Sequence, residues 1–202
     1  EATNIAGTSY VQADVDFLQG MIVHHQQAIL MSELSAERTN NQTILDLADR
    51  IDISQEDEID FMENWLESRG ENKNLSGHKH MKMAGMASSE ELKELRESES
   101  TSFDKMFLKL MINHHDGALE MVKTLKEFPG NSYDSSLDEF ISDLINDQGI
   151  EIERMNGILV NLSEDPRSNL KPGLYDAGES IQNLKLVTSL KKNADWIIKD
   201  LP

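Results

Sequence analysis

Two pairs of adjacent histidines, His24-His25 and His114-His115, are the residues in this chain most suited to chemistry. Neighbouring residues on a helix lie about 100° apart, so both rings of a pair can reach the interior of a bundle on either side of its midline. A methionine, Met21 or Met111, precedes each pair by one turn. Four imidazoles with two thioethers form a ligand set that suits copper, with zinc and iron as alternatives.

The competing interpretation is structural, because a single histidine on an amphipathic helix is more often a hydrogen-bonded core residue than a ligand. Four of the six histidines fall in two matching contexts, which favours metal binding. Glu58 and Glu151 interrupt otherwise apolar stripes. A buried carboxylate needs a partner, so each is expected either to bind the metal directly or to hold an imidazole.

These residues belong to an internal repeat with an offset of ninety positions between residues 14–31 and 104–121. Nine of the eighteen positions agree, including every histidine. A weaker repeat follows, in which Gln55 and Glu58 match Gln148 and Glu151 at an offset of ninety-three. The duplicated unit is therefore predicted to be a helical hairpin.

The apolar spacing predicts helices at about 11–37, 43–69, 101–128 and 134–162. Ser88 is predicted to open a short extra helix through a capping box, and Asp134 to be the N-cap of the last helix. Asp14 and Asp104 lie about 15 Å before the first histidine of each pair along the helix axis, so structural roles are expected for them.

Two such hairpins, at about 10–70 and 100–162, predict an all-α four-helix bundle over residues 1–165. The linker 71–88 joins them. Residues 166–202 do not follow the helical pattern and are expected to be an irregular C-terminal extension or the start of a further module.

The linker is itself rich in histidine and methionine. It offers a second candidate metal site, formed by His78, His80, Met81, Met83 and Met86. Short tracts of this kind bind copper, with imidazole favouring the oxidised ion and thioether the reduced one. The alternative is a solvated loop whose methionines anchor on the bundle.

The net charge of −18 argues against nucleic acid as a partner and favours cations. Cysteine is absent, which excludes thiolate sites and disulfides, and no run of apolar residues is long enough to cross a membrane. The chain starts at Glu1 rather than at methionine, so removal of a signal peptide and export are expected. Enzyme signatures also fail: no Glu-x-x-His pair, zinc-protease motif or phosphate-binding loop is present.

Three features carry a resemblance to a known family: the motifs at 21–28 and 111–118, the Gln55–Met62 pattern, and Met83-Ala-Gly-Met86 with the serines and glutamates that follow. Over about residues 10–162, the chain resembles the DUF305 family in these features. The resemblance implies a ferritin-like bundle, export, and a role in copper binding and resistance. Many relatives have proline before the histidine pair, where this chain has Val23 and Asn113.

The leading hypothesis is thus a periplasmic or extracellular protein that binds, sequesters or delivers copper without turnover, with a copper-donor or copper-acceptor protein as a partner. A bundle metalloenzyme, such as a copper or iron oxidase, and a non-metal structural module are the alternatives.

Overall fold

The computed structural model describes residues 9–74 and 83–162, and within these ranges it contains six α-helices and no strand. The helices are α1 (Gln12–Glu33), α2 (Ser35–Arg38), α3 (Gln42–Ser68), α4 (Ser89–Glu97), α5 (Ser100–Lys126) and α6 (Ser135–Leu162). The four long helices correspond to the four predicted ones, so the all-α fold class is confirmed.

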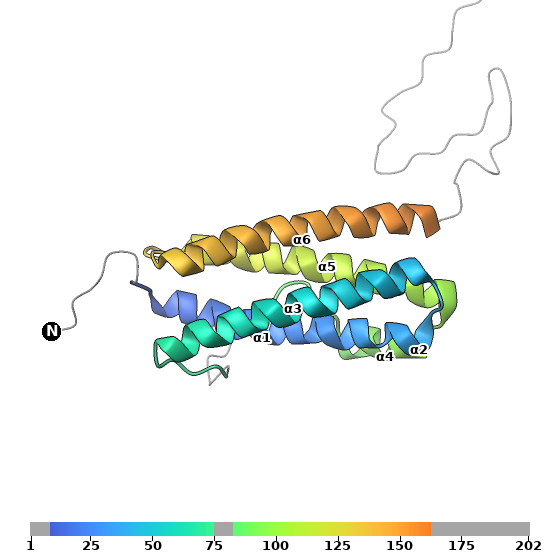
Figure 1. The fold of residues 1–202 in the computed structure, drawn as a ribbon, viewed down its shortest axis with the longest axis horizontal. Helices are drawn as coiled ribbons and strands as arrows, with labels where there is room; N and C mark the ends of the chain where they lie inside the picture. The colour runs from blue at the N-terminus through green and yellow to red at the C-terminus, as the bar shows by residue number, and fades with distance from the viewer. Residues whose placement is uncertain (1–8, 75–82, 163–202) are drawn as a thin grey trace, which may run out of the picture. The chain divides into compact units, whose positions relative to one another are not determined.

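The long helices form two antiparallel hairpins, α1 with α3 and α5 with α6 (Figure 1). The hairpins meet chiefly through α1 and α5, which are the two helices that carry the histidine pairs. Each pair lies near the middle of its helix, so the crossing of α1 and α5 brings the pairs to the centre of the bundle.

Local sequence signals set the helix starts. Ser88 Oγ accepts a hydrogen bond from the Glu91 amide, and Glu91 Oε2 accepts one from the Ser88 amide, which is the predicted capping box of α4. Asp134 Oδ1 accepts hydrogen bonds from the amides of Ser136 and Leu137 at the start of α6. Both predicted caps are therefore confirmed.

The first helix is shorter than predicted. α1 ends at Glu33, and α2 is a single turn beyond it. Leu34, between them, keeps right-handed helical angles (φ −65°, ψ −24°), so the chain interrupts its hydrogen bonding there without changing direction.

The core is divided in two along the bundle. One apolar cluster contains the first half of α1 and the end of α3, and the other contains Met31, the start of α3 and the first half of α5. Between the clusters lies a layer of eight polar residues from the four long helices: His24, His25, Gln55, Glu58, His114, His115, Gln148 and Glu151. Because seven of these residues are buried and Glu58 is partly buried, a polar layer crosses the middle of the core.

The predicted domain boundary at 165 and the C-terminal extension 166–202 lie outside the described residues. No helix in the described part of the chain is both long and apolar enough to cross a membrane.

Candidate metal site

The four paired histidines form a row across the polar layer. The rings of His24 and His114 contact each other at its centre in a tilted arrangement, with 3.7 Å between their centroids and 34° between their planes. His25 and His115 flank this central pair, with ring centroids 6.2 and 6.1 Å from those of their chain neighbours. All four residues are at most 1% exposed. The two pairs therefore meet in the interior of the bundle.

Each ring uses Nε2 for a hydrogen bond to an acceptor. His24 Nε2 lies 2.9 Å from the Ala84 carbonyl oxygen, and His114 Nε2 lies 2.8 Å from the His24 carbonyl oxygen. The outer histidines pair with carboxylates: His25 Nε2 with Glu58, and His115 Nε2 with Glu151 at 2.6 Å. Because carbonyl and carboxylate oxygens accept hydrogen bonds, Nε2 carries the hydrogen in all four rings.

The other ring nitrogen is left free in all four histidines. Each Nδ1 is buried and has no hydrogen-bond partner among the residues that the structure describes. Burial, together with the neighbouring His25, lowers the pKa of His24 to about 4, and burial beside His24 lowers the pKa of His114 well below its ordinary value. Both inner rings are therefore neutral at pH 7, and each Nδ1 presents a lone pair.

This arrangement has the chemistry of metal-ligating imidazoles. A histidine that binds a metal through one nitrogen commonly donates the hydrogen of the other to a carboxylate or a backbone carbonyl. The present rings already make that second contact, twice with carboxylates and twice with carbonyls. In the described residues, however, no group of three or more His, Asp or Glu side chains is arranged to hold an ion.

Glu58 links the row to the surface. Its side chain is 12% exposed and lines a groove of about 370 Å³ between α3 and α6. The stacked rings of Phe61 and Phe140, 4.4 Å apart, join the two helices there. Five carboxylates line this acidic groove: Asp57, Glu58, Glu139, Asp143 and Asp147. Burial beside Glu58 raises the pKa of Asp147, as expected where carboxylates crowd together.

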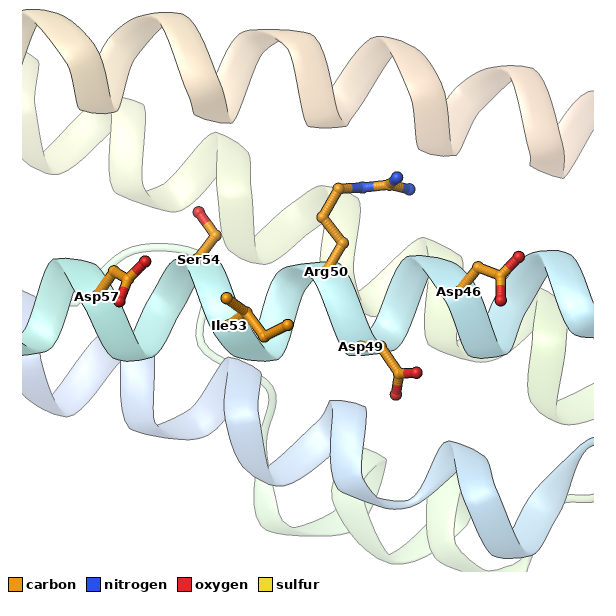
Figure 2. A pocket seen from close by; sticks show the side chains of 6 residues that line it. All are labelled: Asp46, Asp49, Arg50, Ile53, Ser54 and Asp57. Atoms are coloured by element: carbon orange, nitrogen blue, oxygen red, sulfur yellow. The ribbon is translucent and has the colours of Figure 1, made fainter.

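A second hollow lies along the outer side of α3, and Figure 2 shows the six side chains that line it. They include Asp46, Asp49, Arg50 and the exposed Ile53. Ser54 and Asp57 line both this hollow and the acidic groove. None of the four paired histidines lines either hollow.

The methionines predicted as ligands are placed as follows. Met21 and Met111 are fully buried on opposite sides of the polar layer, one in each apolar cluster. Met83 and Met86 are partly buried, and Met83 packs against the cluster that contains Met21. His78, His80 and Met81 lie outside the described residues.

Asp14 and Asp104 have the structural roles expected of them, and each joins the two hairpins. Asp14 Oδ2 accepts a hydrogen bond from the Val11 amide at the start of its own helix, while Oδ1 accepts one from the amide of Ser132 in the α5–α6 loop at 3.0 Å. Asp104 Oδ2 accepts a hydrogen bond from Asn41 Nδ2 in the loop before α3 at 2.9 Å. The duplicated aspartate thus binds the loop of the opposite hairpin in both halves.

Sequence reasoning missed the contact between the linker and the histidine helices. Ala84 provides the acceptor for His24, and Gln27, Asn113 and Gly117 meet the same segment of the linker. Positions 23/113 and 27/117 differ between the two copies of the repeat, but half of the eighteen positions do, so the sequence did not single out this contact.

Comparison with known proteins gives matches of two kinds. A mimivirus protein, the uncharacterized protein L153 of Acanthamoeba polyphaga mimivirus, is 45% identical over 56 residues, which are 28% of this chain and 37% of that protein. The chain thus spans about a third of the length of this curated relative.

Solved structures match over most of the bundle. A Streptomyces coelicolor DUF305 protein described as secreted is 29% identical with a TM-score of 0.66, over 74% of this chain and 92% of that one. CopM in its Cu(I)-bound form is 28% identical with a TM-score of 0.58, over 73% of this chain and 96% of CopM. CopM structures with Cu(II) and with silver match as well, at 29% and 26% identity.

Residues 14–159 match the family described as Domain of unknown function (DUF305), and this range contains both histidine pairs and both partner glutamates. By this match, the chain belongs to the DUF305 family.

Proposed function

We propose that this protein binds copper in the centre of its bundle and sequesters or delivers the ion without turnover. The observation that carries the proposal is the set of four buried imidazoles, each with Nε2 bound to an acceptor and Nδ1 free. The likeness to CopM, whose structures contain Cu(I), Cu(II) and silver, supports copper as the metal over zinc or iron.

The geometry favours the reduced ion. Because no three of the described His, Asp and Glu side chains gather around one point, a bound ion would have to combine fewer imidazole nitrogens with thioether sulfur. Met21 and Met111 are buried one turn from the histidines, and soft thioether ligands select Cu(I). Glu58 and Glu151 would then orient His25 and His115 rather than bind the ion themselves.

The acidic groove provides a route for a cation toward this layer. Its carboxylates raise the local concentration of positive ions, and Glu58 belongs both to the groove and to the histidine row. An acidic rim of this kind also suits a cationic copper-donor or copper-acceptor protein.

We further propose that the protein acts outside the cytoplasm, in the periplasm or beyond. The relative from Streptomyces coelicolor is described as secreted. The chain has ten methionines and no cysteine, and thioether and imidazole ligands keep their binding ability in an oxidising compartment where a thiol would not.

The test is titration of the metal-free protein with Cu(I), Cu(II) and Ag(I), followed by native mass spectrometry and by competition with a chelator. Three variants separate the candidate sites. His25→Gln with His115→Gln removes the outer imidazoles, and His78→Ala with His80→Ala and Met81→Ala removes part of the linker set. Asp46→Asn with Asp49→Asn lowers the surface charge on α3 and leaves both sets intact.

We expect the outer-histidine variant to lose the tightest site and the other two to keep it. If the outer-histidine variant, shown to be folded by circular dichroism, binds copper as tightly as the wild type, the bundle site is wrong. Loss confined to the linker variant would place the copper in residues 78–81. Sustained oxidation of a substrate by the copper-loaded protein would instead favour the metalloenzyme alternative.

A further inference from the structure

The linker segment Met83–Ala87, here called the strap, is held by side chains from both histidine helices. The Gln27 amide group makes two hydrogen bonds to the backbone of Ala87, accepting from its N–H at 2.7 Å and donating to its carbonyl at 3.0 Å. Asn113 Nδ2 donates to the Gly85 carbonyl at 3.2 Å. Together with the bond from His24 to Ala84, these contacts hold the backbone of three of the five strap residues, Ala84, Gly85 and Ala87.

Two glycines allow the strap to lie directly on α5. A Cβ atom at Gly117 would stand 2.1 Å from the Ala84 carbonyl oxygen, and one at Gly85 would stand 2.3 Å from the Asn113 carbonyl oxygen. Gly85 also has a φ of +75°, which strains any residue with a side chain. Contacts this close leave no room for a side chain or a water molecule between the strap and the helix.

The strap breaks the symmetry of the duplicated helices. At the ninety-residue offset, Gln27 corresponds to Gly117 and Val23 to Asn113. Gln27 and Asn113 bind the strap, and Gly117 leaves room for its close approach. The inner histidines differ in the same way. His114 donates to the backbone of the opposite histidine helix, whereas the equivalent nitrogen of His24 donates to the strap.

We infer that the strap is a built part of the histidine site, and that Gln27 and Gly117 are positioning residues that seat it. With the strap seated, the Ala84 carbonyl holds the hydrogen of His24 on Nε2, and Nδ1 keeps its lone pair for a soft metal ion. Without the strap, the two ring nitrogens of His24 would compete for that hydrogen, and the ring would face solvent. This inference rests on the proposed copper function for its consequence, but its structural part can be tested in the metal-free protein.

The experiment uses the full chain and two independent strap variants, each with a matched control. Gly117→Ala places a methyl group where Ala84 lies, and Gly157→Ala is its control, because nothing lies within 4 Å of a Cβ at that helical position. Gln27→Leu removes both hydrogen bonds without adding a metal ligand, and Gln26→Leu makes the same change at its exposed neighbour. The readouts are the ¹⁵N chemical shifts of the His24 ring, amide hydrogen exchange at Ala87, and Cu(I) affinity.

We expect the wild type and both controls to show His24 with its hydrogen on Nε2 and a protected Ala87 amide. Both strap variants should show mixed tautomers of His24 and faster exchange at Ala87. Their Cu(I) affinity should fall by about 10- to 100-fold, the range typical for loss of a partner that orients a metal ligand.

An unchanged His24 tautomer in Gln27→Leu, with Ala87 unprotected, would overturn the inference, as would mixed tautomers with unchanged Cu(I) affinity. If the wild type binds no Cu(I), the proposed function fails, whereas the tautomer and exchange results still decide whether the strap positions His24.

Discussion

The rings of His24 and His114 overlap at the centre of the bundle, 3.7 Å apart, and come from equivalent positions of the two repeats. A positive charge on either ring would be buried beside the other. Burial is the main reason that both pKa values lie below the ordinary 6.5 of histidine, at about 4 for His24. The two inner histidines at the centre of the core are therefore polar but uncharged at neutral pH.

The metal-free protein should lose stability as the pH falls from about 6.5 to 4. In this window the unfolded chain takes up protons at these histidines while the folded chain does not, so the free energy of unfolding decreases. His24 alone accounts for about 3 kcal/mol, since each unit of pKa corresponds to about 1.4 kcal/mol. Urea unfolding at pH 7.5 and pH 5 measures the loss. His24→Gln with His114→Gln should show a smaller loss, and an equal loss in both proteins would contradict the prediction.

Removing the charge of Glu151 should weaken copper binding without unfolding the protein. Glu151 Oε2 lies 2.6 Å from His115 Nε2, and its side chain is only 8% exposed. The change Glu151→Gln keeps the shape of the side chain but makes the imidazole less basic, so we expect Cu(I) affinity to fall by about 10- to 100-fold. Chelator competition gives the affinity. The control is Glu153→Gln, at an exposed position of the same helix, and a fall of the same size in the control would point to surface charge instead.

The repeat predicted that both histidine pairs can reach the interior of the bundle, because the requirements for this are local, but it left open whether the two pairs meet. Matching residues on matching helices must occupy equivalent places, and the apolar spacing of Phe17, Met21 and Ala28 directs the same face inward. The same repeat singled out Glu58 and Glu151, either as metal ligands or as partners of an imidazole. The caps at Ser88 and Asp134 were also predictable, since each depends on residues within three positions.

The strap could not be predicted, because it depends on the distance between segments that are far apart in the chain. Nothing in the residues around Ala84 indicates that its carbonyl meets His24, sixty positions away. Gly117 on α5 resembles an ordinary helix-weakening residue until the close approach of Ala84 is seen. The second role of Asp14, its bond to Ser132, was missed for the same reason.

Asp134 should be one of the most sensitive positions for stability. Burial raises its pKa, but hydrogen bonds from Ser136 and Arg69, with others from Leu137 and Trp65, outweigh burial and bring the pKa to about 2. The change Asp134→Ala removes the cap of α6 and leaves Trp65 Nε1 without its acceptor, so the free energy of unfolding should fall by about 2–3 kcal/mol. Urea unfolding at pH 7 tests this, with Asp138→Ala in the same turn as the control. A loss no larger than the control's would show that the cluster contributes little.

Asp14 and Asp104 occupy equivalent positions but should respond differently to replacement by asparagine. Both oxygens of Asp14 accept hydrogen bonds from backbone amides, so in Asp14→Asn the new NH₂ group must face an N–H donor. We expect the free energy of unfolding of Asp14→Asn to fall by about 1–3 kcal/mol, the range for an unsatisfied buried polar group.

In Asp104 only Oδ2 has a partner in the described structure, and the other oxygen is buried without one. Asp104→Asn can keep the bond from Asn41 while removing a buried charge, so its loss should be clearly smaller. Urea unfolding of the two variants at pH 7 gives the comparison, and a larger loss for Asp104→Asn would show that its charge is stabilised by groups other than Asn41.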